Sequence, residues 1–192
     1  MTDHIFTLLN RDNRFTKQEV EEIVGLLTIQ SFAKGTSLLK VGEAAKKCYF
    51  ILSGCVRQYR LEDGVEKTTA FYLEHQSVIP ENYWSEKASN DYLFCNEAVT
   101  AIVGDPANEG EMYAKYPKLE SLMLSLVEKD FGKTREEFSD FVSSSPEKRY
   151  LNLLENRPEL LQRVPQNQIA SLLGITPESL SRIRKRISKM PR

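Results

Sequence analysis

The chain has 192 residues, enough for one or two domains with a buried core. Apolar residues make up 41% and charged residues 28%, which is typical of a folded globular protein and excludes a disordered one. No stretch approaches the roughly 18 consecutive apolar residues of a membrane-spanning helix, and the N-terminus has no basic segment followed by an apolar run. We therefore expect a cytoplasmic protein without a secretory signal.

The charge is unevenly distributed, although the net charge is only −1. Residues 146–192 carry ten Lys and Arg against four Glu, a net charge of +6. Residues 1–145 carry sixteen Lys and Arg against twenty-three Asp and Glu, a net charge of −7. A basic C-terminal segment on an acidic body predicts that this segment binds nucleic acid. The alternative is a basic helix that is only solvated.

The cysteine and histidine content argues against metal chemistry. Cys48, Cys55 and Cys95 form no C-x-x-C pair, which disfavours a disulfide framework, a zinc ribbon and a cysteine-ligated iron–sulfur cluster. A metal-dependent enzyme built on β-strands would need two or three histidines there, and His75 stands alone in the β-rich region. We expect no metal, no cofactor and no enzymatic activity.

The N-terminal half predicts a helix and then a β-domain. Thr16-Lys17-Gln18-Glu19 is a capping box that predicts the start of a short amphipathic helix. From about Ile29 to Val103, runs rich in Val, Ile, Thr, Phe and Tyr alternate with turn residues about every 8–12 residues, which predicts a β-sandwich or roll. Glu62-Asp63-Gly64 between two such runs predicts a hairpin.

Residues 112–142 predict a helix with two apolar faces. Leu119, Leu122, Met123 and Leu126 form a face that we expect to pack within its own domain. The second face has the 3-4 spacing of a coiled-coil seam and predicts a homodimer. The seam residues are Leu124, Val127, Phe131, Thr134, Phe138 and Phe141. The alternative is one wide apolar stripe in a monomer.

A hinge is predicted at residues 143–146, where three serines precede Pro146. After it, residues 165–188 predict two helices joined by a turn. Gly174 supplies the turn, and Ala170 is small where the two helices approach closely. Thr176 caps the second helix, with Pro177 at its first position. Three apolar residues are expected to bury the second helix: Leu180, Ile183 and Ile187.

The outer face of this second helix predicts DNA recognition, because a recognition helix places its first residues on base edges in the major groove. Arg182 suits the two acceptors of guanine, and Glu178 can accept from cytosine. The predicted DNA-binding residues are Thr176, Pro177, Glu178, Ser179, Ser181, Arg182, Lys185, Arg186 and Lys189. Such basic residues also attract phosphates without regard to sequence. The alternative is an ordinary helical hairpin with a basic surface.

The order of these parts resembles the Crp/Fnr family of bacterial transcription regulators over roughly residues 15–188. Residues 34–43 and 48–56 look like the turn glycines and strands of a cyclic-nucleotide-binding β-roll. Residues 168–174 with Glu178 and Arg182 are similar to the family's DNA-reading unit.

The resemblance implies an α+β fold: an N-terminal double-stranded β-roll (cyclic-nucleotide-binding-like jelly roll) with flanking helices, a long dimerisation helix and a C-terminal helix-turn-helix domain. We expect that last domain to lack a full wing, because few residues follow Ser188. The expected domains are a sensor at residues 1–111, a dimerisation helix and hinge at 112–145, and a DNA-binding domain at 146–192. The implied partners are double-stranded DNA, a second copy of the chain and RNA polymerase.

The sequence departs from the family's nucleotide site, in which a Gly-Glu pair and, about ten residues later, an Arg followed by Ser or Thr hold ribose and phosphate. Glu81 can keep the ribose role, but no arginine occurs between Arg60 and Arg135, and Asp91 would repel a phosphate. No N-terminal cysteine cluster is present, which argues against an oxygen-sensing iron–sulfur version. We expect a degenerate domain that senses an unknown small-molecule effector or none. The alternative is a genuine cyclic-nucleotide-binding regulatory protein with a non-standard phosphate site.

An effector pocket in the β-roll is predicted from its aromatic residues. The expected lining is Tyr72, Glu81, Asn82, Tyr83, Trp84, Tyr92 and Thr134. The alternative is that most of these aromatics are core and that the pocket is collapsed.

Overall fold

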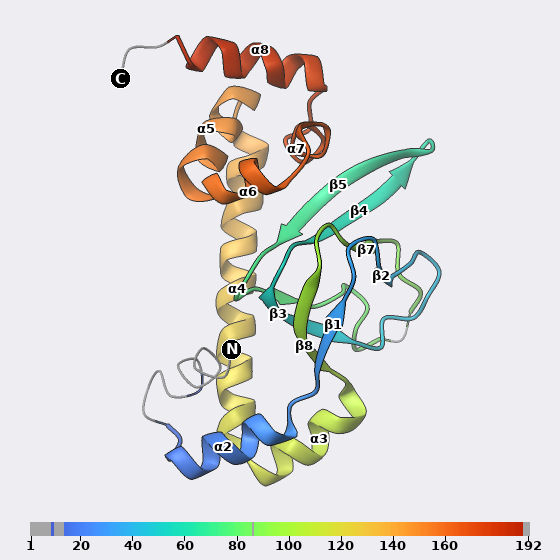
Figure 1. The fold of residues 1–192 in the computed structure, drawn as a ribbon, viewed down its shortest axis with the longest axis vertical. Helices are drawn as coiled ribbons and strands as arrows, with labels where there is room; N and C mark the ends of the chain where they lie inside the picture. Colours follow the sequence, from blue (N-terminus) through green and yellow to red (C-terminus); the bar gives the residue numbers. More distant parts are fainter. Residues whose placement is uncertain (1–8, 10–13, 86, 190–192) are drawn as a thin grey trace. The chain divides into compact units, whose positions relative to one another are not determined.

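The structure, a computed structural model, describes residues 9, 14–85 and 87–189 (Figure 1). These residues form two compact units. The first holds the described residues up to Val56 together with Tyr72–Gly132. The second holds Arg57–Phe71 together with the described residues from Lys133 onward.

Strands occupy the middle of the sequence. They are β1 (Ile29–Phe32), β2 (Ser37–Leu39), β3 (Cys48–Ser53), β4 (Val56–Glu62), β5 (Val65–Tyr72), β6 (Ser77–Val78), β7 (Tyr92–Cys95) and β8 (Val99–Gly104). Helices flank them on both sides. They are α2 (Lys17–Leu26), α3 (Pro106–Lys115), α4 (Pro117–Ser143), α5 (Pro146–Asn156), α6 (Pro158–Arg163), α7 (Gln166–Leu172) and α8 (Pro177–Ile187).

Two four-stranded sheets build the β-roll. One has the order β1-β8-β3-β6, with antiparallel pairs such as Tyr49 opposite Val103, and the other has the order β2-β7-β4-β5. The core combines residues of both sheets: Ile51 and Val99 of the first sheet cluster with Leu93 of the second, and all three are almost completely buried. The predicted α+β fold with an N-terminal β-roll followed by helices is confirmed.

The predicted hairpin joins β4 and β5. Asp63 and Gly64 form its two-residue turn, with φ of 52° and 76°. Two consecutive positive φ angles match the twist of the flanking strands, and Asp-Gly is a sequence that adopts them readily. The prediction from residues 62–64 is therefore confirmed.

A helical cluster completes the first unit. Thr16 caps α2 as predicted: its hydroxyl accepts from the Glu19 N–H at 3.2 Å, and the Glu19 carboxylate accepts from the Thr16 N–H at 2.7 Å. Val20 and Ile23 of α2 are buried against Leu119 and Leu122 of α4. Met123 and Leu126 pack against the same cluster, which confirms the inward apolar face of α4.

The C-terminal part of α4 lies outside this apolar cluster. Every residue from 128 to 143 is exposed, including Phe131 at 71% and Phe138 at 68%. None of the described helices is long and apolar enough to cross a membrane. Among residues 9, 14–85 and 87–189, no element covers the aromatic side chains of this part of α4.

The second unit packs α5 to α8 around a small core of its own. Leu160, Ala170 and Leu180 are at most 1% exposed. Ser145 caps α5 by accepting from the Lys148 N–H at 3.3 Å, and Pro146 follows it. Between the end of α4 at Ser143 and the start of α5 lie only two residues, Ser144 and Ser145.

Candidate nucleic-acid interface

Helices α7 and α8 form the predicted helix-turn-helix. Gly174 has φ of 68° in the turn, and the Ile175 N–H donates to the Ala170 carbonyl at 3.0 Å to close α7. Ala170 is fully buried where the helices approach each other. Thr176 caps α8 by accepting from the Ser179 N–H at 3.2 Å, and Pro177 stands at the first position of the helix. The signals predicted from the sequence thus produce the expected local structure.

Helix α8 has one buried and one exposed side. Leu180 and Ile183 are buried, and Ile187 is half-buried. The predicted DNA-binding residues, apart from half-buried Ser179, are exposed: Thr176, Pro177, Glu178, Ser181, Arg182, Lys185, Arg186 and Lys189. The outer side of α8 is therefore polar and open in the single chain.

Glu178 and Arg182 lie one turn apart on this exposed side. Hydrogen bonding to its own backbone N–H, then to the Thr176 hydroxyl, and then the charge of Arg182 lower the pKa of Glu178 from its ordinary value. Arg182 Nε lies 3.4 Å from the Glu178 carbonyl oxygen. Glu178 is thus a stable carboxylate at neutral pH, which suits acceptance from a base amine and disfavours contact with a phosphate.

Arg186 differs from the other cations of α8 because it is already paired. Its Nε donates to Glu147 Oε1 at 3.0 Å, and its Nη2 donates to the other oxygen of the same carboxylate. Such a two-point pair fixes the guanidinium in a plane. Arg186, predicted to contact DNA, therefore also holds α8 to the first turn of α5.

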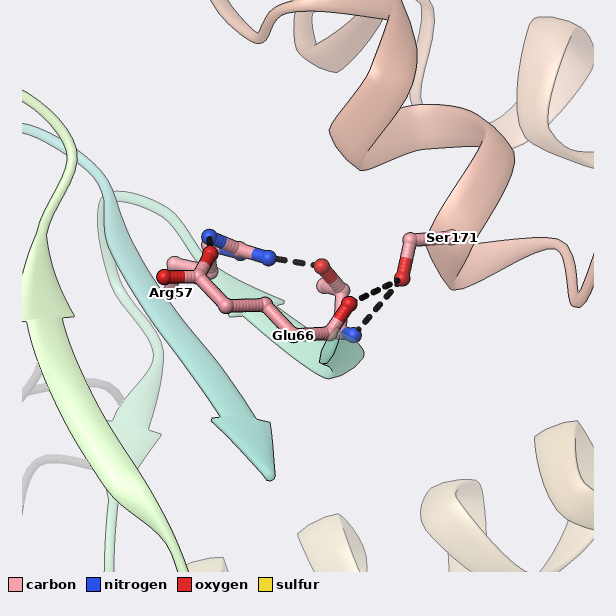
Figure 2. Close-up of polar contacts among 4 residues, drawn as sticks. Arg57, Glu66 and Ser171 are labelled. Carbon is pink, nitrogen blue, oxygen red and sulfur yellow. Dashed lines mark hydrogen bonds and ion pairs between the residues drawn. The ribbon is translucent and has the colours of Figure 1, made fainter. Parts of the chain in front are cut away.

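Helix α7 also binds the β4–β5 hairpin within the second unit. Figure 2 shows the Ser171 hydroxyl between two backbone groups of β5. It accepts from the Thr68 N–H at 2.9 Å and donates to the Glu66 carbonyl at 3.3 Å. These are the groups that a neighbouring strand would use, so one serine side chain occupies this part of the strand edge. Arg157 adds a third contact by donating to the Phe71 carbonyl at 2.8 Å.

Arg57 stiffens the hairpin beneath this contact. Only 4% of it is exposed, and it donates to the Thr68 hydroxyl at 2.9 Å and to the Glu66 carboxylate at 2.5 Å (Figure 2). Its guanidinium also lies 4.7 Å from the centre of the Tyr59 ring. A buried guanidinium needs such partners, because an unpaired charge in the interior is costly. Ser171 therefore binds a hairpin whose two strands are held together by the side chain of Arg57. No pattern in the sequence predicts these contacts of Ser171, Arg57 and Glu66.

The residues expected to line an effector pocket are in different environments. Tyr83 is buried, Tyr72 packs partly against the β-roll core, and Trp84 is 68% exposed. Asn82 donates to the Ala88 carbonyl at 3.0 Å. Of the others, Tyr92 is half-buried, whereas Glu81 and Thr134 are exposed.

The Tyr83 hydroxyl is part of a polar cluster in the first unit. Its hydroxyl donates to Glu109 Oε1 at 3.0 Å, and the Cys48 thiol lies 3.5 Å from the same oxygen. Burial raises the pKa of the Cys48 thiol to about 11, so this cysteine is a thiol rather than a thiolate at neutral pH. In the part of the chain that the structure describes, no three His, Cys, Asp or Glu side chains group closely enough to hold a metal ion.

This chain is similar to known proteins in both sequence and fold. Residues 29–87 match the family described as "Cyclic nucleotide-binding domain". The "Fumarate and nitrate reduction regulatory protein" of Vibrio cholerae is 25% identical over 170 residues, which cover 81% of this chain and 67% of the relative.

Two solved structures show the same fold. FixK2 from Bradyrhizobium japonicum has a TM-score of 0.69 at 17% identity, over 84% of each chain. A mutant of CooA from Carboxydothermus hydrogenoformans has a TM-score of 0.68 at 14% identity, over 95% of this chain and 83% of the other.

In this chain a β-roll that matches a cyclic-nucleotide-binding domain over residues 29–87 is followed by a long helix and a helix-turn-helix. The resemblance predicted from the sequence is confirmed: the chain is similar in sequence to a cyclic-nucleotide-binding domain and to a fumarate and nitrate reduction regulatory protein, and it shares the fold of FixK2 and CooA. The relative from Vibrio cholerae is named as a regulatory protein.

The hairpin contact makes a prediction. Replacing Ser171 by alanine removes the acceptor of the Thr68 N–H, and a typical hydrogen bond contributes about 0.5–1.5 kcal/mol. Amide exchange at Thr68 should become about two- to tenfold faster, measured by hydrogen–deuterium exchange with NMR detection. Ser181→Ala, at an exposed serine of α8, is the control and should leave Thr68 unchanged. Equal exchange in both variants would contradict the contact.

Proposed function

We propose that this protein is a homodimeric bacterial transcription regulator that binds palindromic double-stranded DNA through α7 and α8. The observation that carries the proposal is the exposed outer side of α8, where Arg182 follows the Thr176 cap by six residues on a helix-turn-helix. In such units the first turns of the second helix read base edges. We also propose that the domains end at residues 111 and 145 and that RNA polymerase is a partner.

The dimer would form along the exposed part of α4. Large apolar side chains that are exposed in one stripe on a soluble protein usually mark an interaction surface. Leu124 is 59% exposed, and Phe131 and Phe138 are exposed to a similar degree. Val127 is half-buried and Thr134 is exposed on the same stripe. A second copy in parallel orientation would cover these side chains and bring two copies of α8 into a twofold arrangement.

The β-roll would bind an unidentified small-molecule effector, or it would have no effector. Phosphate binding is disfavoured because Glu81 and Asp91 lie in the segment where the family holds phosphate and because Tyr83 brings the Glu109 carboxylate to the same segment. Lys87 is a point charge and cannot reproduce the planar, two-point grip of an arginine.

The dimer is tested by charge insertion. Phe131→Asp with Phe138→Asp would place two carboxylates from each chain in a dry seam, and the protein should become monomeric in light scattering at micromolar concentration. Gly132→Asp with Ser139→Asp is the control, because each change moves the same charge about 100° around the exposed helix. A wild-type protein that is itself monomeric under these conditions would refute the seam.

DNA recognition is tested by selection from a random pool. The wild type should select a palindrome with half-sites about one helical turn, roughly 34 Å, apart. Arg182→Ala should cost about 1–3 kcal/mol and relax the preference at one base pair per half-site. Lys189→Ala should weaken binding to all sequences alike. Selection of the same site by Arg182→Ala with undiminished preference would exclude Arg182 as a base reader.

The alternative function, a cyclic-nucleotide-dependent regulator with a non-standard phosphate site, is tested by calorimetric titration. Because an ionised phosphate without a matched cation is costly to bury, we expect no binding of cAMP or cGMP tighter than about 0.1 mM. DNA footprints should be the same with and without either nucleotide. Micromolar affinity for cAMP, or a footprint that depends on it, would favour the alternative.

A further inference from the structure

Arg149, near the start of α5, contacts three separate segments of the second unit. Its Nε donates to the Ser144 carbonyl at 3.1 Å, and its Nη1 donates to the Leu173 carbonyl at 3.0 Å. Its guanidinium lies 3.8 Å from the centre of the Phe141 ring. One side chain therefore joins the end of α4, the two-residue link to α5 and the turn between α7 and α8.

The chemistry of these contacts requires an arginine. Leu173 is the C-terminal cap of α7 and Ser144 directly follows the end of α4, so both carbonyls lie at helix ends, which carry partial negative charge. The planar guanidinium can donate in two directions while one face stacks on an aromatic ring, and a lysine ammonium cannot. Arg149 thus satisfies two helix ends and one ring at the same time.

Gly174 lies next to this arrangement. A Cβ at this position would lie 3.4 Å from Arg149 Nη1 and 3.5 Å from Phe141 Cζ. The turn that orients α8 is therefore in direct proximity to the end of α4. Phe141, expected in the dimer seam, is 38% exposed and contributes its ring to this contact.

We propose that Arg149 is a positioning residue that sets the distance between the two half-sites the dimer accepts; this inference rests on the proposed function. If α4 pairs with its copy, the separation of the two α8 helices depends on the angle between α4 and the helix-turn-helix. The link at Ser144 and Ser145 is outside both helices and does not fix that angle alone. Arg149 bridges the link and holds the turn at Leu173 to the end of α4.

The test separates half-site reading from half-site spacing. Two copies of the selected half-site are joined by spacers of every length up to about one helical turn, roughly 10 base pairs, and the pool is selected with each variant. Arg149→Lys keeps the positive charge, so non-specific attraction to phosphates is preserved. Lys148→Arg, the reverse exchange at the exposed neighbouring position, is the matched control.

We expect the wild type and Lys148→Arg to enrich one spacer length. Arg149→Lys should keep the half-site sequence, enrich several spacer lengths and bind the wild-type spacer about tenfold more weakly, because hydrogen bonds of a charged group are lost. Binding to a single isolated half-site should be unchanged. A single sharp spacer preference in Arg149→Lys, equal to that of the wild type, would overturn the inference.

A second variant guards against misfolding. Phe141→Leu removes the stacking partner and leaves the arginine in place, so a smaller broadening of spacer preference is expected, with melting by circular dichroism as the folding control. If Arg149→Lys does not fold, an unchanged spacer preference in folded Phe141→Leu overturns the inference. A wild type that selects no DNA overturns the proposed function itself, which is a distinct outcome.

Discussion

The left-handed backbone at Gly174 determines what α8 can present to a partner. A residue with a Cβ adopts φ near 68° only at a cost, so glycine at this turn sets the angle between α7 and α8. The two helices approach each other closely at Ala170, which is fully buried. Burial of Leu180 and Ile183 then fixes the rotation of α8 about its axis, and Arg182 is left pointing to the outside.

The C-terminal part of α4 exposes large apolar side chains. Most helical stability in proteins comes from packing of an apolar face rather than from intrinsic propensity. Every residue from 128 to 143 is exposed, and Phe131 and Phe138 among them are each about 70% exposed. The N-terminal part of the same helix is anchored through Leu119 and Leu122. Anchoring at one end and apolar exposure at the other favour a helix that pairs with its own copy.

The sequence predicted the features that depend on neighbouring residues. The Thr16 capping box, the Asp63-Gly64 hairpin turn and the Thr176 cap are each encoded within a few positions. Contacts between distant positions were not predictable: Arg186 and Glu147 are 39 residues apart, and Ser171 bonds β5 across more than a hundred. Aromatic content likewise predicts that a side chain such as Tyr83 is buried, but not that a distant carboxylate binds its hydroxyl.

The distribution of positive charge also has a structural explanation that the net charge hides. Of the ten Lys and Arg in residues 146–192, several have partners inside the protein. Arg186 pairs with Glu147, whereas Arg149 and Arg157 donate to backbone carbonyls at 2.8–3.1 Å. An arginine held in this way organises the domain, and its guanidinium is not free to turn toward a phosphate. The net charge of +6 already includes Glu147, and the carbonyl partners leave the positive charges of Arg149 and Arg157 unchanged. Arg182, Lys185 and Lys189 are exposed, and these are the side chains that the proposed function assigns to a base and to the phosphates.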